Sequence, residues 1–333
     1  MPRVSVLLPA WQAAATLPAC LASLARQTEP DWECVLVDDG STDDTRAIAH
    51  AAAARDARIV VVATPHRGLV AALTAGLAHC RAPVVARMDA DDVMHRARLA
   101  AQLAALAAAP ELAAVGSHVR LFPRATLTDG RRAYERWLNA IDSPARVRAD
   151  AFVECPVAHP TLAVRTDVVR AHGYRDCGWP EDYDLLLRLL AAGHAVGVVP
   201  RRLLAWRDRP ERLTRTADAY RLDRFTALKA AFLAGGPLAG RDDYVLWGYG
   251  HTGRALHRAL AAHGKHPTHV VDLHPGRLGQ RIHGADVVPP DALTTLPRRP
   301  LVVSVAGDEP RRQIRAALAT MGFQELRDYV CAA

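Results

Sequence analysis

Residues 33–43 read ECVLVDDGSTD, an apolar run that passes directly into carboxylates, a glycine and two hydroxyl side chains. The run from Glu33 to Val37 is short and apolar, which is typical of a buried strand. Gly40 permits a tight turn, and Ser41 or Thr42 can cap a helix that follows it. The stretch therefore predicts a strand, a turn and a helix in succession, which is the repeating unit of an α/β fold.

The same alternation extends from the N-terminus to about residue 121 and predicts a mostly parallel sheet flanked by helices. Polar or turn-forming residues follow the strands that end at Leu8, Val37 and Met88. Because ligands bind at the carboxyl ends of the strands in open α/β sheets, we expect these three loops to lie together. The predicted strands are Val4 to Leu8, Glu33 to Val37, Ile59 to Ala63, Pro83 to Met88 and Ala113 to Leu121, and the predicted helices are Leu17 to Arg26, Thr42 to Ala54, Leu69 to Cys80 and Arg96 to Ala108.

A second acidic loop, Asp89-Ala90-Asp91-Asp92, follows the strand that ends at Met88. Here Asp89 can face a ribose while Asp91 coordinates a divalent cation, and Mg²⁺ or Mn²⁺ suits such carboxylate oxygens. Asp39, in the first acidic loop, is placed to accept hydrogen bonds from a nucleobase or a ribose. Each loop alone is equally well explained as an ordinary turn or helix cap. Together they favour a site for a nucleotide-sugar, which offers a nucleoside and a diphosphate as separate targets.

The composition limits the class of protein. The 333 residues favour two domains, and a hydrophobic content of 50% permits real cores. The net charge of +7 comes from scattered arginines, and only 5% of the residues are aromatic, so small anionic ligands are favoured over nucleic acid. The six cysteines lack zinc-site spacing, and neither a signal peptide nor an apolar run of about 20 residues is present. We expect a cytoplasmic protein, with peripheral contact at the inner face of the membrane left open.

A second domain is predicted at the C-terminal end. Residues 1–235 form the first domain, with a motif core at 3–210 and a helical extension at 211–235, and a Gly- and Pro-rich linker at 236–241 leads to residues 242–333. This last segment opens with a strand from Tyr244 to Trp247, a glycine pattern, a helix from Arg254 to His263 and a strand from Thr268 to Val271. A further strand is expected from Leu301 to Ala306. The order predicts a smaller Rossmann-like α/β domain.

The glycine pattern is Gly248-x-Gly250-x-x-Gly253, and Asp272 ends the next strand. In a dinucleotide-binding domain such glycines let the backbone approach a phosphate, while the acidic residue holds a ribose hydroxyl. A nucleotide or NAD(P) is therefore a candidate ligand of this domain. A degenerate module that only packs against the first domain or pairs subunits explains the pattern equally well.

Several short motifs follow one another along residues 3 to about 210. In these motifs and their order the sequence resembles the family 2 glycosyltransferases of GT-A fold. The resemblance implies a GT-A nucleotide-diphospho-sugar transferase fold for the first domain. The matching segments are Val4 to Ala10, Asp38 to Asp43, His66 to Leu69 with Ala75 to Leu77, Met88 to Asp92, His159 to Thr161, Gly173 to Arg175, and Glu181 to Leu185 with Leu187 to Leu189.

The resemblance also implies roles for individual residues. Pro9, Asp39 and Asp89 correspond to nucleotide contacts, Arg67 to a contact near the phosphates or ribose, and Asp91 to the metal ligand. Asp182 corresponds to the catalytic base that takes the proton of the acceptor hydroxyl in an inverting transfer.

Two further residues are candidates for the acceptor side, namely His159 and Glu181. Their alternatives are a turn residue before Pro160 and an ordinary acidic helix N-terminus. The sequence departs from the family at His66, where an asparagine is common, and near Thr74. It also lacks the Gln-x-x-Arg-Trp signature of processive synthases, so we expect one sugar to be added per encounter.

The sequence thus predicts an inverting, non-processive glycosyltransferase that uses a nucleotide-sugar donor and a saccharide or lipid-linked acceptor, in cell-surface glycan or glycoconjugate synthesis. The alternatives are a nicotinamide-dependent oxidoreductase acting through the C-terminal domain and a non-catalytic nucleotide-sugar sensor. The arginine-rich stretch from Arg201 to Arg224 is a candidate contact for anionic lipid or a lipid-diphosphate acceptor, with a solvated helix face as the alternative. The sugar, the base, the acceptor and the oligomeric state stay open.

Overall fold

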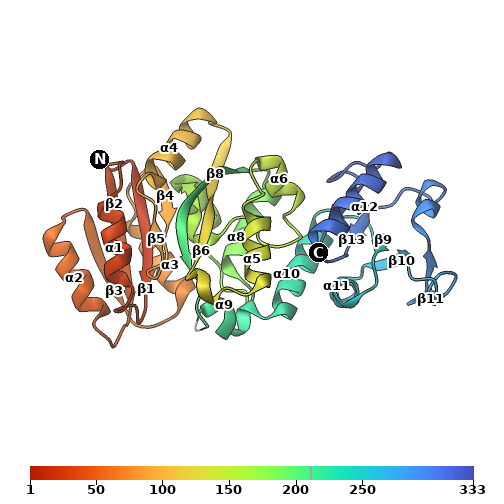
Figure 1. Ribbon diagram of the computed structural model, residues 1–333, viewed down its shortest axis with the longest axis horizontal. Coiled ribbons are helices and arrows are strands. Elements are labelled where there is room, and N and C mark those ends of the chain that lie inside the picture. The colour runs from red at the N-terminus through yellow and green to blue at the C-terminus, as the bar shows by residue number, and fades with distance from the viewer. Residues whose placement is uncertain (211) are drawn as a thin grey trace. The chain divides into compact units, whose positions relative to one another are not determined.

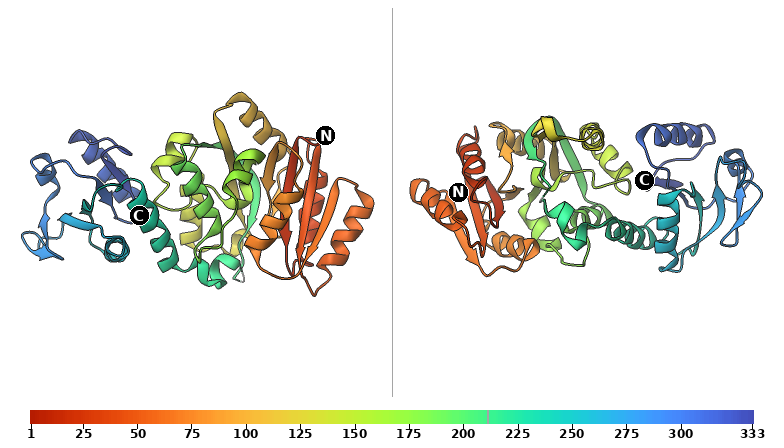
Figure 2. Two further views of the ribbon diagram at one scale, coloured as in Figure 1. Left: turned by 180° about the vertical axis from the view of Figure 1, so that it is seen from behind. Right: turned by 60° about the horizontal axis from the view of Figure 1, so that its bottom comes forward.

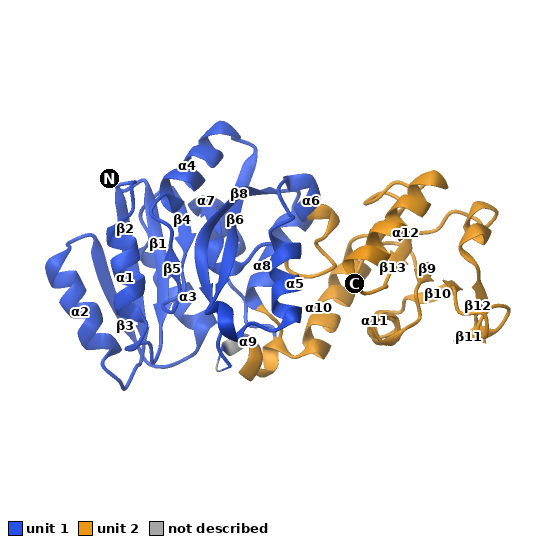
Figure 3. Cartoon of the chain, in the orientation of Figure 1, with its two compact units in different colours: residues 1–147, 157–177, 181–212 blue, residues 148–156, 178–180, 213–333 orange. Residues whose placement is uncertain are grey.

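The computed structural model describes residues 1–210 and 212–333 and divides into two compact units. Unit 1 comprises residues 1–147, 157–177 and 181–212, and unit 2 comprises residues 148–156, 178–180 and 213–333 (Figure 3). The helix at Leu222–Gly235, which the sequence assigned to the first domain, is grouped with unit 2. Glu211, within the predicted arginine-rich stretch, lies outside the described residues.

In the part of the chain that the structure describes, unit 1 is built on an eight-stranded sheet of order β3-β2-β1-β4-β7-β6-β8-β5 (Figure 1). β1 pairs in parallel with both β2 and β4, so the three loops predicted to carry the site follow neighbouring strands. The strands are β1 (Val4–Ala10), β2 (Trp32–Asp39), β3 (Ile59–Thr64), β4 (Val84–Arg87), β5 (Val93–Met94), β6 (Leu112–Phe122), β7 (Ala163–Arg165) and β8 (Ala195–Arg207).

The five strands and four helices predicted for residues 1–122 are confirmed, with ends that differ by at most three residues. The antiparallel strand β7 and the long strand β8 complete the sheet beyond them. The helices from the N-terminus to residue 191 are α1 (Leu17–Ala25), α2 (Thr45–Arg55), α3 (Leu69–His79), α4 (Arg98–Ala108), α5 (Asp129–Leu138), α6 (Pro144–Ala149), α7 (Thr166–His172) and α8 (Glu181–Ala191), with short 3₁₀ turns η1 (Arg124–Thr126) and η2 (His159–Thr161).

Helices of unit 1 lie on both sides of its sheet (Figure 2). On one side Leu8 of β1 shares a core cluster with Leu17 and Leu24 of α1. On the other side α3 approaches β1 so closely that a Cβ on Gly76 would lie 2.4 Å from a methyl group of Leu7. Because successive side chains point to opposite faces and helices cover both, every residue of β1 is buried, and all of them except Ser5 are apolar.

Within the described residues, the second half of β6 has no strand neighbour on one side, because β7 pairs with it only at Ala114 and Val115. Side chains of α5 take the place of a strand there. The Asn139 amide accepts a hydrogen bond from the Val119 backbone N–H at 2.9 Å and donates one to the Val119 carbonyl at 2.9 Å. Buried Glu135 accepts from the Leu121 N–H at 3.3 Å. These bonds satisfy an otherwise open sheet edge and fix α5 against β6.

Unit 2 contains a six-stranded sheet of order β11-β12-β10-β9-β13-β14 within the described residues. Its five parallel strands follow the order 3-2-1-4-5 of a doubly wound sheet. The elements are α9 (Leu213–Thr216), η3 (Asp218–Tyr220), α10 (Leu222–Gly235), β9 (Asp243–Trp247), α11 (His251–Ala261), β10 (His266–Val271), β11 (Arg281–Ile282), β12 (Ala285–Val288), η4 (Pro290–Thr294), β13 (Leu301–Val303), α12 (Asp308–Thr320) and β14 (Tyr329–Cys331).

Among the described residues we find no helix with the length and apolar character needed to cross a bilayer.

Candidate active site

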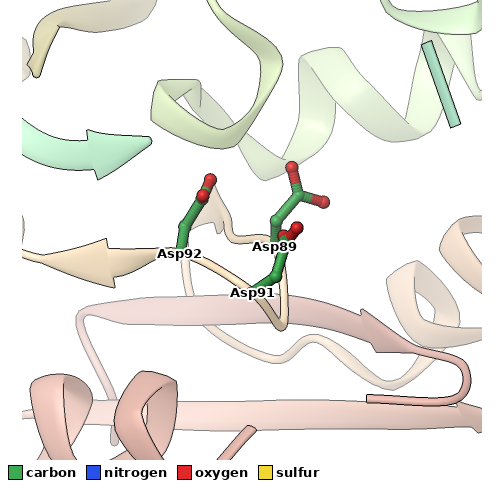
Figure 4. Close-up of side chains that lie close together, drawn as sticks. All are labelled: Asp89, Asp91 and Asp92. Atoms are coloured by element: carbon green, nitrogen blue, oxygen red, sulfur yellow. The ribbon is translucent and has the colours of Figure 1, made fainter. Parts of the chain in front are cut away.

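Three carboxylates lie together in the loop between β4 and β5 (Figure 4). Asp89, Asp91 and Asp92 each offer an oxygen, and these oxygens lie within 4.8 Å of one another. Asp92 is only 1% exposed, and its Oδ1 accepts a hydrogen bond from the Arg207 N–H at 2.7 Å. Its buried Oδ2 has no hydrogen-bond partner among the described residues. The loop thus presents clustered hard oxygens, one of which lacks a donor.

Burial and neighbouring charges shift the pKa values of the three carboxyls in different directions. Burial disfavours ionisation of Asp89, but its ion pair with buried Arg87 outweighs that effect and holds the pKa of the Asp89 carboxyl below its usual value. Burial, followed by the charge of Asp89, raises the pKa of Asp91 even though Arg209 lies 3.3 Å away. The same two causes raise the pKa of Asp92 well above its usual value. A divalent cation bound here would offset this repulsion, so the residues fit Mg²⁺ or Mn²⁺.

The loops after β1 and β2 are joined by Gln12. Its carboxamide oxygen accepts from the Thr42 N–H at 2.8 Å, and its backbone N–H donates to the Ser41 hydroxyl at 3.1 Å. Gly40 makes the turn between Asp39 and Ser41 with a φ of 68°, and a Cβ there would lie 2.6 Å from the His66 nitrogen. Any larger residue at position 40 would force the backbone at His66 to move. The packing of the loop that carries His66 therefore requires a glycine here.

Asp39 is directed toward its own chain. Its carboxylate accepts from the backbone N–H groups of Arg67 at 3.0 Å and Gly68 at 2.9 Å, and it lies 2.8 Å from the His66 Nδ1. These donors use most of the accepting capacity of the carboxylate. In this structure Asp39 therefore holds the loop from His66 to Gly68, and a direct contact between Asp39 and a nucleobase or ribose stays a prediction.

An aromatic platform lies next to Asp39. The ring of Trp11, which follows β1 and is 53% exposed, stacks on the His66 imidazole with centroids 4.4 Å apart and planes 12° apart. Arg67 is exposed, and its guanidinium has no ion-pair partner among the described residues. Pro9 lies buried within β1. An accessible ring and an unengaged cation are what a nucleotide needs for stacking and for phosphate binding.

The residues around α8 form a second, mostly buried group. The His159 Nε2 lies 3.2 Å from the Tyr174 hydroxyl, and its Nδ1 lies 3.5 Å from the Glu181 carboxylate. Burial, reinforced by Arg87, lowers the pKa of His159, which favours the neutral ring. His159 and Glu181 are 6% and 4% exposed, so they are placed to support the site from within. Asp182 follows at the second position of α8 and is only half-buried.

Tyr174 connects this group with the carboxylate loop. Burial raises the pKa of the Tyr174 phenol, Arg87 opposes the rise, and Glu181 and Asp182 add to it. Arg87 and Asp182 therefore both lie within Coulombic reach of one phenol, and Arg87 is in turn paired with Asp89. The base predicted from the resemblance and the predicted metal ligands thus belong to one electrostatic neighbourhood within unit 1.

In unit 2, the predicted glycine loop joins β9 to α11. A Cβ on Gly253 would lie 2.0 Å from the Gly248 carbonyl oxygen, whereas a Cβ on Gly250 would meet nothing within 4 Å. The Asp272 carboxylate accepts from the His274 N–H at 2.8 Å and pairs with Arg277 at 2.7 Å. Asp272 is thus engaged within its own loop. Binding of a nucleotide or NAD(P) by this unit stays a prediction.

Sequence reasoning did not single out four residues that the structure places at the site, namely Trp11, Arg87, Asp92 and Tyr174. Arg87 is the detectable one, because an arginine that ends a fully apolar strand two residues before an aspartate is unusual for a buried segment. The others depend on tertiary contacts.

Comparison with known proteins identifies the family of this chain. The sequence profile described as Glycosyl transferase family 2 matches residues 5–173. The chain is 33% identical over 186 residues to the amylovoran biosynthesis glycosyltransferase AmsE of Erwinia amylovora, which covers 55% of this chain and 67% of that protein. It is 28% identical over 228 residues to the putative glycosyltransferase EpsE of Bacillus subtilis, covering 67% and 79%.

Solved structures support the fold. S. aureus TarS 1-349 in complex with UDP-GlcNAc superposes with a TM-score of 0.55 at 17% identity, covering 70% of this chain and 67% of that one. The mannosyltransferase PcManGT from Pyrobaculum calidifontis, in complex with GDP-Man and Mn²⁺, gives a TM-score of 0.53 at 21% identity, covering 72% and 65%. The predicted fold class is confirmed for the GT-A part. The chain is a glycosyltransferase and belongs to glycosyl transferase family 2.

Proposed function

We propose that unit 1 transfers a sugar from a nucleotide-diphospho-sugar to an acceptor hydroxyl with inversion at the anomeric carbon. The observation that carries the proposal is the carboxylate cluster Asp89, Asp91 and Asp92, with its unpartnered buried oxygen, at the carboxyl end of β4. In open α/β sheets this is where ligands bind. The nucleotide-sugars bound in the two solved structures described above support the choice of donor class.

The donor nucleoside would lie over the Trp11 and His66 rings. The exposed indole offers a flat face for stacking, and the loop that Asp39 holds fixes its partner ring from behind. Arg67 is placed on the same loop to meet phosphate oxygens with its unengaged guanidinium. Stacking tolerates any base, so this arrangement supports a nucleotide site without choosing among bases.

Asp91 and Asp92 would hold Mg²⁺ or Mn²⁺, with Asp89 beside them on the ribose side. When bound, such an ion offsets the negative charge on the departing nucleoside diphosphate. The Asp92 oxygen that lacks a donor and the repulsion that raises the pKa of Asp91 are the observations that fit an ion. The Mn²⁺ named for the mannosyltransferase supports the same class of ion.

Asp182 would act as the base. As the acceptor oxygen attacks the anomeric carbon from the side opposite the diphosphate, the C–O bond to the diphosphate breaks and the hydroxyl proton passes to the Asp182 carboxylate. The buried pair of Glu181 and His159 anchors the start of α8 and so fixes where Asp182 stands. We propose that these two buried residues position the base, and a direct contact of either with the acceptor stays a prediction.

The relatives support a biological setting. The similar protein of Erwinia amylovora is a glycosyltransferase of amylovoran biosynthesis, which supports polysaccharide synthesis as the setting of this chain. We propose a saccharide or lipid-linked acceptor and one sugar added per encounter.

The test begins with donor binding. Nucleotide-sugars with different bases are added to wild type, Asp91→Ala and the control Asp31→Ala, whose exposed side chain lies before β2 at the opposite end of the sheet. A thermal shift that needs Mn²⁺ and disappears only in Asp91→Ala is expected. Turnover with the donor so identified should then fall about 10²- to 10⁴-fold in Asp182→Asn. Donor binding without turnover on any acceptor by wild type would instead support the sensor, and unchanged turnover in Asp182→Asn would remove this residue as the base.

A further inference from the structure

A basic pocket of about 640 Å³ lies in unit 1 over the second half of β6, outside the carboxylate loop. Arginines from β6, η1, α5 and β8 converge on it, against a single carboxylate. Its volume lies in the range of small-molecule sites. The charged residues that line the pocket are Arg120, Arg124, Arg132, Glu135, Arg136 and Arg202.

The pocket is held in place by the contacts that complete the edge of β6. Glu135 of α5 and Asn139, the residue that follows α5, bond the backbone of Leu121 and Val119, so the helix cannot slide along the strand without breaking these bonds. Arg132 and Arg136 project from this fixed helix. The fold therefore fixes the backbone from which these side chains project. Less conformational entropy is then lost when a ligand binds.

Most of the positive charge in the pocket is unbalanced. Glu135 pairs with Arg124, and the Arg132 Nη2 donates to the Arg124 carbonyl at 2.8 Å. Arg120, Arg136 and Arg202 form neither an ion pair nor a side-chain hydrogen bond with any residue that the structure describes. Five arginines against one glutamate leave the lining with a charge of +4. Like charges gathered in this way repel one another, and an anion would relieve the repulsion.

The chemistry of the lining selects the class of anion. Guanidinium groups bind phosphate oxygens through paired N–H donors, and several from different directions match a multiply charged group. No aromatic ring lines the described part of the pocket, so a base has nothing to stack on. We propose that Arg120, Arg136 and Arg202 form a binding site for a phosphate or diphosphate group. Its source is a soluble phosphorylated compound or the phosphate of a lipid head group.

None of the residues proposed to contact the donor diphosphate lines this pocket. Arg202 precedes Arg207, whose N–H bonds Asp92, by five residues on β8, about 17 Å along an extended strand, whereas Arg120 pairs with Ala205, two residues from Arg207. Arg131 of α5 lies 3.1 Å from Asp208, just beyond that end of the strand. The pocket is therefore a neighbour of the transfer site and is built from other residues.

Binding of inorganic pyrophosphate tests the proposal. Calorimetric titration of the full chain in the presence of a chelator excludes metal-dependent binding at the carboxylate loop. The variant Arg120→Gln/Arg136→Gln/Arg202→Gln is compared with wild type and with Arg26→Gln/Arg55→Gln/Arg96→Gln, which removes the same charge from exposed positions elsewhere in unit 1. We expect wild type and control to bind and the pocket variant to bind at least tenfold more weakly. Equal affinity in all three proteins, or no binding by wild type, overturns the proposal.

Vesicles distinguish the sources. Wild type, pocket variant and control are sedimented with phosphatidylcholine vesicles, with and without phosphatidic acid. Retention of wild type and control but not of the pocket variant on the acidic vesicles assigns the site to a lipid phosphate. Pyrophosphate binding without vesicle retention assigns it to a soluble phosphate. Neither measurement uses turnover. The result for this binding site is therefore independent of whether the proposed transfer reaction is confirmed.

Discussion

Replacing Asp184 by asparagine should destabilise unit 1 by loosening α8. This carboxylate is fully buried and accepts two hydrogen bonds from Arg175, at 2.7 and 3.1 Å, and one from Arg188 at 2.7 Å. Breaking a buried ion pair costs about 3–5 kcal/mol, whereas an exposed one contributes about 0–1 kcal/mol. The Arg175 side chain is 46% exposed and that of Arg188 only 12%, so the loss lies between these limits. We expect the free energy of unfolding to fall by about 2–3 kcal/mol.

The dependence on pH provides a second readout. Burial disfavours ionisation of Asp184, but the hydrogen bonds from Arg175 and Arg188 outweigh it, so the pKa of this carboxyl is lowered in the folded state. A carboxyl whose pKa is lower in the folded chain stabilises it above the unfolded value, about 3.9, and this contribution is lost as the pH falls through the folded value. The difference between wild type and Asp184→Asn should therefore be full at pH 7 and shrink in acid.

Urea denaturation at a series of pH values measures both effects. Asp223→Asn is the control, because Asp223 and its partner Arg221 are 65% and 67% exposed and should contribute within about 0.5 kcal/mol. A loss below about 0.5 kcal/mol in Asp184→Asn, or a loss that does not change between pH 7 and pH 3, would refute the account of α8 as a helix anchored by this carboxylate.

Two further substitutions probe the donor platform and the glycine loop of unit 2. Trp11→Ala should weaken donor nucleotide binding by about 5- to 150-fold, since stacking contributes about 1–3 kcal/mol per base, while Trp11→Phe should retain most of the affinity; an unchanged dissociation constant would remove Trp11 from the site. Gly253→Ala should lower the thermal stability of unit 2, because the added methyl group would lie 2.0 Å from the Gly248 oxygen, whereas Gly250→Ala, with open space around it, should be neutral; equal melting curves would contradict this packing.

Local sequence signals were sufficient to predict the strands and helices of residues 1–122. The strand ending at Val37 was predictable because an apolar run meets an Asp-Gly turn within a few residues, and each signal acts on its own stretch of backbone. The location of the carboxylate loop followed from the parallel order of β1, β2 and β4. β7 and β8 could not be predicted in the same way, because their places depend on pairing across long sequence separations.

The contacts of individual site residues were harder to predict from the sequence. Nothing near Asp39 in the sequence indicates that its carboxylate is occupied by the N–H groups of Arg67 and Gly68, 28 and 29 residues away. The sequence placed Asp92 in the acidic loop but indicated no role for it. Only burial by β8 shows that it is the member of the cluster with an unpartnered oxygen.

The adjacent carboxylates of Glu181 and Asp182 differ in burial, and this difference suits the two roles proposed for them. Glu181 is 4% exposed and faces His159, so its charge is used inside the protein and is shielded from solvent. Asp182 is half-buried at the start of the same helix, where the positive end of the helix dipole favours a carboxylate. A base must reach an acceptor that arrives from solvent, and a positioning residue must not move. These two environments suit the proposed roles, in which Glu181 positions the helix and Asp182 acts as the base, whereas the sequence alone made Glu181 a candidate for the acceptor side.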